Sequence, residues 1–152
     1  MHKSQGDSKL LRVANDVFFQ EVKKHLIEGK EVLFTIKGNS MQPFLSNGDK
    51  IIITPADERD FTFGKIILAN SAYGYVLHRL VWRFKTNIWL AGDNNLVQLE
   101  KVNKRDVLGV VKYALIDNKR INVHSLGRLT LSFIWFLLRP LRLIWFKLRR
   151  LL

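Results

Sequence analysis

The stretch from Val32 to Pro55, VLFTIKGNSMQPFLSNGDKIIITP, joins two strand-like segments through an abrupt break. Apolar residues alternate with others at its start, and a second short apolar run precedes the final proline, as in β-strands. Between the two segments, Gly38 permits a positive φ and Pro43 cannot continue a hydrogen-bonded ladder. We expect this break to lift the side chain of Ser40 off the sheet and towards solvent.

Similar short segments follow along the chain and are separated by clusters of turn-forming residues. The segments typical of strands are 65–70, 75–82, 88–91 and 107–115, with 120–123 a weaker candidate. Strands of this length and spacing favour a compact, mostly antiparallel sheet. The predicted fold class is therefore mainly β, a small barrel-like domain over residues 30–125.

Residues 1–29 predict a helix ahead of this domain. Apolar side chains recur between Leu10 and Ile27 at a spacing of three to four residues, and Gly29 can end the helix. We expect the apolar stripe to pack on the core of the β domain. No apolar run follows the polar N-terminal residues, so nothing here predicts a secretion signal.

Residues 126–152 predict a basic amphipathic helix. The net charge of the chain is +12, and residues 119–152 hold eight of its Lys and Arg and no acidic residue. Large apolar and aromatic side chains occupy most of the helix surface opposite one polar stripe. The members of this polar stripe are Arg128, Ser132, Arg139, Arg142, Arg149 and Arg150.

Such a helix is typical of a membrane interface, where cations meet anionic headgroups and aromatic side chains lie at the boundary. Arginines and Pro140 interrupt the apolar run, which disfavours a simple membrane span. We therefore expect residues 126–152 to bind a membrane surface with anionic lipids. The alternative is a helix that covers the core of its own domain or binds a partner protein.

The composition excludes several other classes of protein. A chain of 152 residues with 47% hydrophobic and 25% charged residues suits one folded domain. It has no cysteine, which excludes disulfides, thiolate metal sites and cysteine nucleophiles. Histidines and carboxylates do not cluster at ligand spacing, so we expect no metal and no cofactor. The cations of the tail alternate with large aliphatic residues rather than lining a polar groove, so we expect no nucleic-acid partner.

Ser40 could act as a nucleophile only with a base within hydrogen-bond reach. A serine at such a break is usually a plain turn residue. Of the four histidines, only His78 lies inside a predicted strand, and an imidazole can accept a proton near neutral pH. On the residues alone, a turn serine and a packing histidine remain the alternatives to a catalytic pair.

Three ordered boxes make the chain resemble signal peptidases and LexA-like serine peptidases. Residues 38–43, GNSMQP, resemble the nucleophile box of these families, and Gly48-Asp49 and a strand follow as expected. The second box ends in His78-Arg79, and the third is Gly92-Asp93-Asn94-Asn95. Bacterial signal peptidases and LexA-like proteins have lysine as the base, whereas the archaeal and endoplasmic-reticulum type has histidine followed by arginine, as here. The resemblance covers about residues 30–113 and is closest to this histidine branch.

The resemblance implies a serine endopeptidase that cleaves an extended peptide, such as a leader or signal-peptide-like segment. Ser40 is the implied nucleophile, His78 the implied general base, and Asp93 the implied group that orients or charge-balances the histidine. Together with Ser40, Met41 and Pro43 are the implied substrate-binding and oxyanion residues.

One departure from the family pattern affects the third catalytic residue. In the histidine branch a second acid usually follows the third box within a few residues, whereas here the nearest acid is Glu100. Asp93 is therefore the favoured third member of the site, and Glu100 is the alternative.

Only one helix precedes the nucleophile box, which is too little for the DNA-binding module of LexA-like repressors. The sequence thus favours a short stand-alone bacterial member, peripheral on the cytoplasmic face of the inner membrane. Its alternative function is a catalytically weakened peptide-binding module at the membrane surface.

Overall fold

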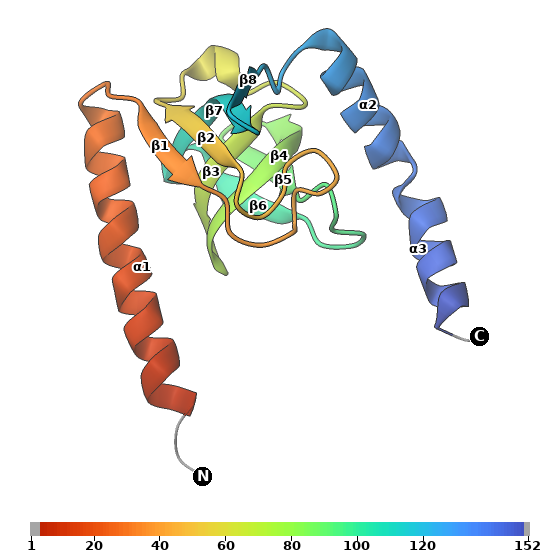
Figure 1. Cartoon of the computed structure of the whole chain (residues 1–152), viewed down its shortest axis with the longest axis horizontal. Helices are drawn as coiled ribbons and strands as arrows, with labels where there is room; N and C mark the ends of the chain where they lie inside the picture. Colours follow the sequence, from red (N-terminus) through yellow and green to blue (C-terminus); the bar gives the residue numbers. More distant parts are fainter. Residues whose placement is uncertain (1–3, 151–152) are drawn as a thin grey trace.

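The computed structural model describes the backbone of residues 4–150 and the side chains of residues 16–150 (Figure 1). The helices are α1 (Ser4–Ile27), α2 (Leu126–Leu137) and α3 (Arg139–Arg149), with short 3-10 helices η1 (Glu58–Asp60) and η2 (Lys104–Asp106). The strands are β1 (Val32–Thr35), β2 (Lys50–Thr54), β3 (Ile66–Ser71), β4 (Gly74–Phe84), β5 (Asn87–Ala91), β6 (Glu100–Asn103), β7 (Val107–Ile116) and β8 (Lys119–Ile121).

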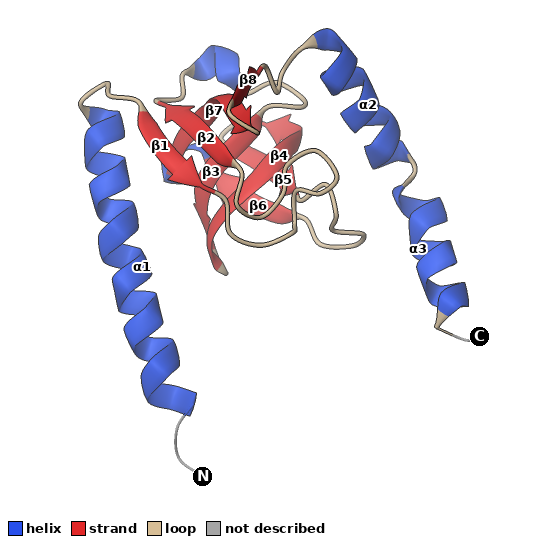
Figure 2. Ribbon diagram, in the orientation of Figure 1, coloured by secondary structure: helices blue, strands red, loops and turns tan. Residues whose placement is uncertain are grey.

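All eight strands belong to one curled antiparallel sheet (Figure 2). Its order is β1-β2-β7-β3-β4-β5-β6, and β8 pairs with β7. The predicted mainly β class with helices at both ends is confirmed. One strand, β6, was not predicted, because its sequence EKVN offers a single apolar residue to mark it.

Alternation along the central strands divides the core between the two faces of the sheet. On β3, Ile66 and Leu68 belong to one buried cluster, whereas Ile67 and Ala69 belong to the other. This follows from the two-residue period of a strand, which sends successive side chains to opposite faces. Because both faces are covered, β3 is apolar without interruption over these four residues.

The C-terminal half of α1 covers the first of these clusters. Val22 and Leu26 are buried in it, and the Phe19 ring stacks on the Tyr75 ring of β4 at 4.0 Å between centroids. The apolar stripe therefore packs on the β domain, as expected from its spacing. The start of the predicted stripe, at residues 10–13, lies outside the residues whose side chains are described.

The tail is two helices rather than the single expected one. The axes of α2 and α3 differ by 51° across Leu138, and Pro140 occupies the first turn of α3. Pro at that position has no intrahelical hydrogen bond to lose, so it starts a new helix more readily than it continues an old one. Of the described residues, no single helix has the length and apolar character to cross a membrane, and only this bent pair meets both criteria together.

The α2–α3 pair docks on the β domain through part of the predicted polar stripe, whereas Arg149 and Arg150 of the same stripe are exposed. Ser132 and Arg139 are buried, and Leu129 lies so close to Gly64 that a Cβ there would stand 2.6 Å from the leucine Cδ2. Large apolar side chains on the opposite side of the pair are exposed. They include Leu126, Leu131, Ile134, Leu141, Ile144 and Trp145.

His124, in the link between β8 and α2, has a structural role. Its Nε2 accepts a hydrogen bond from the Ile66 main-chain N–H at 3.2 Å. Burial, together with the nearby charges of Lys65 and Arg79, lowers the pKa of His124 to about 4. The ring is therefore neutral at pH 7 and keeps the lone pair that this hydrogen bond needs.

Candidate active site

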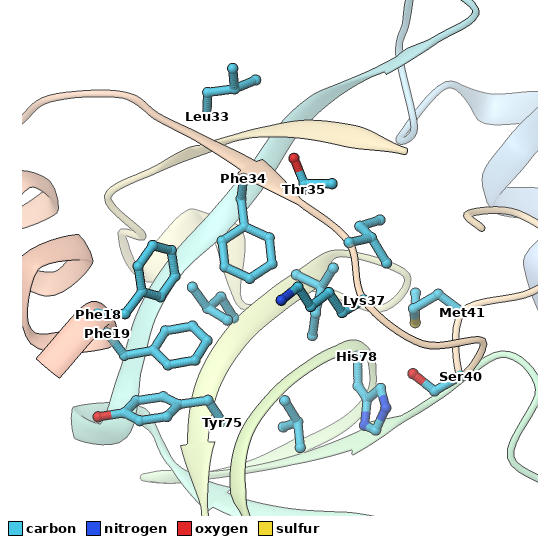
Figure 3. Close-up of a pocket in the computed structure, with 14 residues that line it drawn as sticks. Phe18, Phe19, Leu33, Phe34, Thr35, Lys37, Ser40, Met41, Tyr75 and His78 are labelled. Atoms are coloured by element: carbon cyan, nitrogen blue, oxygen red, sulfur yellow. The ribbon is translucent and has the colours of Figure 1, made fainter. Parts of the chain in front are cut away.

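Ser40 and His78 line the same pocket, which has a volume of about 650 Å³. The loop after β1 contributes Ser40, β4 contributes His78, and the aromatic side chains of α1 close the far end (Figure 3). In this view the Ser40 hydroxyl lies on the side of its loop that faces the imidazole. Among the described contacts no hydrogen bond joins the two groups, a looseness that sites without substrate often show.

The local backbone explains why Ser40 projects into the pocket. Ile36 closes the base of the loop through main-chain hydrogen bonds with Gly48 and Asp49, at 2.9 and 2.8 Å. Gly38 then turns the chain with a φ of 95°, a value that disfavours any residue with a Cβ. Met41 follows and is buried in the core, so the loop is anchored on both sides of the half-buried serine.

His78 is oriented by Glu100. Its Nδ1 lies 2.9 Å from Glu100 Oε2, and both residues are buried, with 6% and 2% of their surface exposed. An ionised carboxylate only accepts hydrogen bonds, so the proton of the neutral ring lies on Nδ1. This tautomer leaves the lone pair on Nε2, as a general base requires.

Asp93 does not contact the imidazole, in contrast to the expected role. Both its carboxylate oxygens accept hydrogen bonds from Arg79, each at 2.8 Å, and a further guanidinium nitrogen donates to the Gly64 carbonyl at 2.7 Å. His78 and Arg79 are successive residues of β4, so their side chains leave opposite faces of the sheet. A carboxylate that pairs with Arg79 is therefore on the wrong face to reach His78.

Instead, the third sequence box, residues 92–95, contacts the loop that carries Ser40. The Asn94 main-chain N–H donates to the Ser40 carbonyl oxygen at 2.8 Å. A Cβ on Gly92 would stand 2.7 Å from the same oxygen, closer than real side chains approach. Glycine at this position thus lets the two loops touch directly.

The main-chain amides of Ser40 and Met41 donate to no main-chain carbonyl within the described part of the chain. Donation of these amides to an oxyanion is the chemistry that the resemblance implies for this turn. The Met41 side chain contributes to the wall of the pocket. Pro43 is exposed, follows a cis peptide bond and is not one of the residues that line the pocket.

Glu100, the alternative to Asp93 in the sequence, is the carboxylate that contacts His78. It begins β6, where Glu100 and Val102 are buried and the intervening Lys101 is exposed. That alternation is the only local signal, and a buried carboxylate does not look like a core residue in sequence. Across residues 16–150, no three His, Asp or Glu side chains gather in a way that could hold a metal ion.

Comparison with protein families gives one match. The model of the Peptidase S24-like family matches residues 4–112, which is more than half of the sequence. The chain belongs to the Peptidase S24-like family. Membership indicates serine-peptidase-type chemistry, and the matched range includes Ser40, His78, Asp93 and Glu100. It ends before α2 and α3. No curated protein and no solved structure matches the chain.

Proposed function

We propose that the chain is a serine endopeptidase of the histidine-base type, with Ser40 as nucleophile, His78 as general base and Glu100 as the group that orients the base. The observation that carries the proposal is that His78, paired with the buried Glu100, lines the same pocket as Ser40. A serine hydroxyl is a weak nucleophile unless its proton is removed during attack. An imidazole held in the correct tautomer supplies that step.

In the proposed mechanism, Ser40 Oγ attacks the scissile carbonyl carbon while Nε2 of His78 accepts the hydroxyl proton. The main-chain amides near Ser40 stabilise the resulting oxyanion, and each such donor contributes about 2.7–4 kcal/mol in other enzymes. His78 then returns the proton to the leaving amine, which produces an acyl-enzyme and a new N-terminus. Water, deprotonated by the same ring, hydrolyses the acyl-enzyme.

The proposed substrate is an extended peptide, such as a leader or signal-peptide-like segment. β1 is the end of the strand order, and its only partner among the described strands is β2. A peptide added along β1 would gain main-chain hydrogen bonds and present alternate side chains to the pocket. The far end of that pocket is aromatic, with Phe19, Phe34 and Tyr75, so it suits apolar substrate side chains.

A serine-directed fluorophosphonate tests the catalytic proposal, because only an activated hydroxyl displaces its fluoride. We expect intact-mass analysis to show one adduct on the wild type and none on Ser40→Ala or His78→Gln. Ser46→Ala, in the same loop, is the matched control and should be labelled like the wild type. A folded wild type that stays unlabelled would contradict the peptidase proposal and favour the alternative, a catalytically weakened peptide-binding module.

We further propose that the outward side of α2–α3 binds anionic lipid, on the cytoplasmic face of a bacterial inner membrane. Support comes from the exposed apolar side chains of the pair and from the exposed cations Lys147, Arg149 and Arg150 at its end. The 119–152 segment has no acidic residue to repel such a surface. Apolar insertion and cation attraction together are the usual requirements for interfacial binding.

Substitution of an exposed tail residue tests this lipid proposal. Trp145 is 63% exposed, so Trp145→Asp should leave the fold intact while weakening binding to phosphatidylglycerol-containing vesicles about tenfold or more. Tyr73→Asp, at an 81% exposed position of the β3–β4 hairpin, introduces the same charge and should change nothing. Cosedimentation measures both. Equal binding by Trp145→Asp and the wild type would contradict the proposal.

A further inference from the structure

The described hydrogen bonds from the inward side of the α2–α3 pair to the β domain all go to one short segment. This segment, residues 92–99, connects β5 to β6. Trp135 Nε1 donates to the Asp93 carbonyl at 2.8 Å. Arg139 donates to two more main-chain carbonyls, those of Asn95 at 2.8 Å and Gln98 at 3.2 Å. The tail thus replaces the hydrogen bonds that a sheet neighbour would give to these carbonyls.

Arg139 is an unusual residue for such a contact. Only 9% of its surface is exposed, and its hydrogen-bond acceptors among the described residues are main-chain carbonyls rather than a carboxylate. Burying a charge against neutral acceptors is costly, and the hydrogen bonds to these carbonyls offset part of that cost. Arg142 adds a longer hydrogen bond to the Asp93 carbonyl, at 3.3 Å, and stacks on the Trp135 ring.

The other side of the same segment touches the candidate active site. Asn94 donates to the Ser40 carbonyl, and Gly92 lies against the same oxygen. The segment then leads directly into Glu100, the partner of His78. Residues 92–99 therefore lie between the tail and the catalytic groups, in contact with both.

We propose that Arg139 and Trp135 are positioning residues of the peptidase site: by fixing residues 92–99 from outside, they hold Ser40 and Glu100 in their reactive arrangement. The inference rests on the proposed function. Displacements of about 1 Å cost on the order of 100-fold in rate when reacting groups must be aligned. Activity consequently depends on the docked tail, although no tail residue touches the substrate.

Fluorophosphonate labelling in the absence of lipid tests this role. We expect Arg139→Gln to lower the maximal labelling rate at least tenfold with little change in the probe concentration that gives half of this rate. Arg139→Lys, which keeps the charge and one donor, should recover part of the rate. Trp135→Phe removes the indole N–H together with part of the ring on which Arg142 stacks, and should lower the rate severalfold. Arg105→Gln and Trp82→Phe, at exposed positions of the β domain, are the matched controls.

The outcomes separate this inference from the proposed function. If Arg139→Gln and Trp135→Phe label at the wild-type rate while Ser40→Ala stays unlabelled, the positioning role is overturned and the peptidase remains. If the folded wild type itself is unlabelled, the proposed function fails and this inference fails with it. Should Arg139→Gln not fold, Trp135→Phe decides, and a rate equal to that of Trp82→Phe overturns the role.

Discussion

Replacing Glu100 by glutamine is expected to lower kcat by about four orders of magnitude while the chain stays folded. The carboxylate lies 2.9 Å from His78 Nδ1, and in the proposed mechanism it also stabilises the imidazolium that forms during attack. A neutral amide loses that stabilisation, and it can present an N–H that forces the ring into the wrong tautomer. The corresponding change in a well-characterised serine peptidase costs about 10⁴ in kcat.

The measurement is turnover of any peptide that the wild type cleaves, with circular dichroism to establish folding. Glu58→Gln is the matched control, because Glu58 pairs with Lys104 on the surface and is far more exposed than Glu100. A Glu100→Gln enzyme within tenfold of the wild type would show that this carboxylate does not orient the base. Asp93 could not orient the base in its place, since both of its carboxylate oxygens accept hydrogen bonds from Arg79.

Local sequence patterns were sufficient to predict most of the fold. Alternation around Val32 and the apolar runs near Ile51 and Val110 correspond to β1, β2 and β7, because burial of alternate or successive side chains leaves a direct trace in composition. β6 left no such trace. Two of its four residues are charged, and the buried one of these two, Glu100, pairs with His78 of β4.

The same limit applies to the third site residue. The resemblance favoured Asp93 because it belongs to a conspicuous box, but pairing of side chains depends on which face of β4 each residue occupies. Although His78 and Arg79 are neighbours in sequence, they pair with different carboxylates. His78 pairs with Glu100, and Arg79 pairs with Asp93. Strand alternation could have suggested this division, since two adjacent residues cannot both face one acid.

The tail shows what an amphipathic pattern leaves undetermined. The spacing of its arginines defines a polar stripe, but it does not say which stripe packs on the protein. Here Arg139 turns inward because main-chain carbonyls of residues 92–99 offer acceptors that no apolar side chain could use. The apolar stripe is left outside as a consequence.

Replacing Asp93 by alanine is expected to lower the free energy of unfolding by about 3–5 kcal/mol. Arg79 is 2% exposed, and it would keep its bond to the Gly64 carbonyl but lose both hydrogen bonds to the carboxylate. An uncompensated guanidinium in the interior is much more costly than a missing ion pair at the surface, which is worth at most about 1 kcal/mol. Urea unfolding followed by tryptophan fluorescence measures the loss.

The double variant Arg79→Met, Asp93→Ala distinguishes this cause from simple loss of packing. Removing the charge together with its partner should restore part of the stability, so the double variant is expected to be more stable than Asp93→Ala alone. Glu31→Ala, which breaks the exposed pair with Lys112, is the control and should cost less than about 1 kcal/mol. If Asp93→Ala were no more destabilising than this control, the Arg79–Asp93 pair would not hold the third box in place. The hydrogen bonds from the tail to residues 92–99 would then have to maintain the close contact of Gly92 with Ser40 without help from this pair.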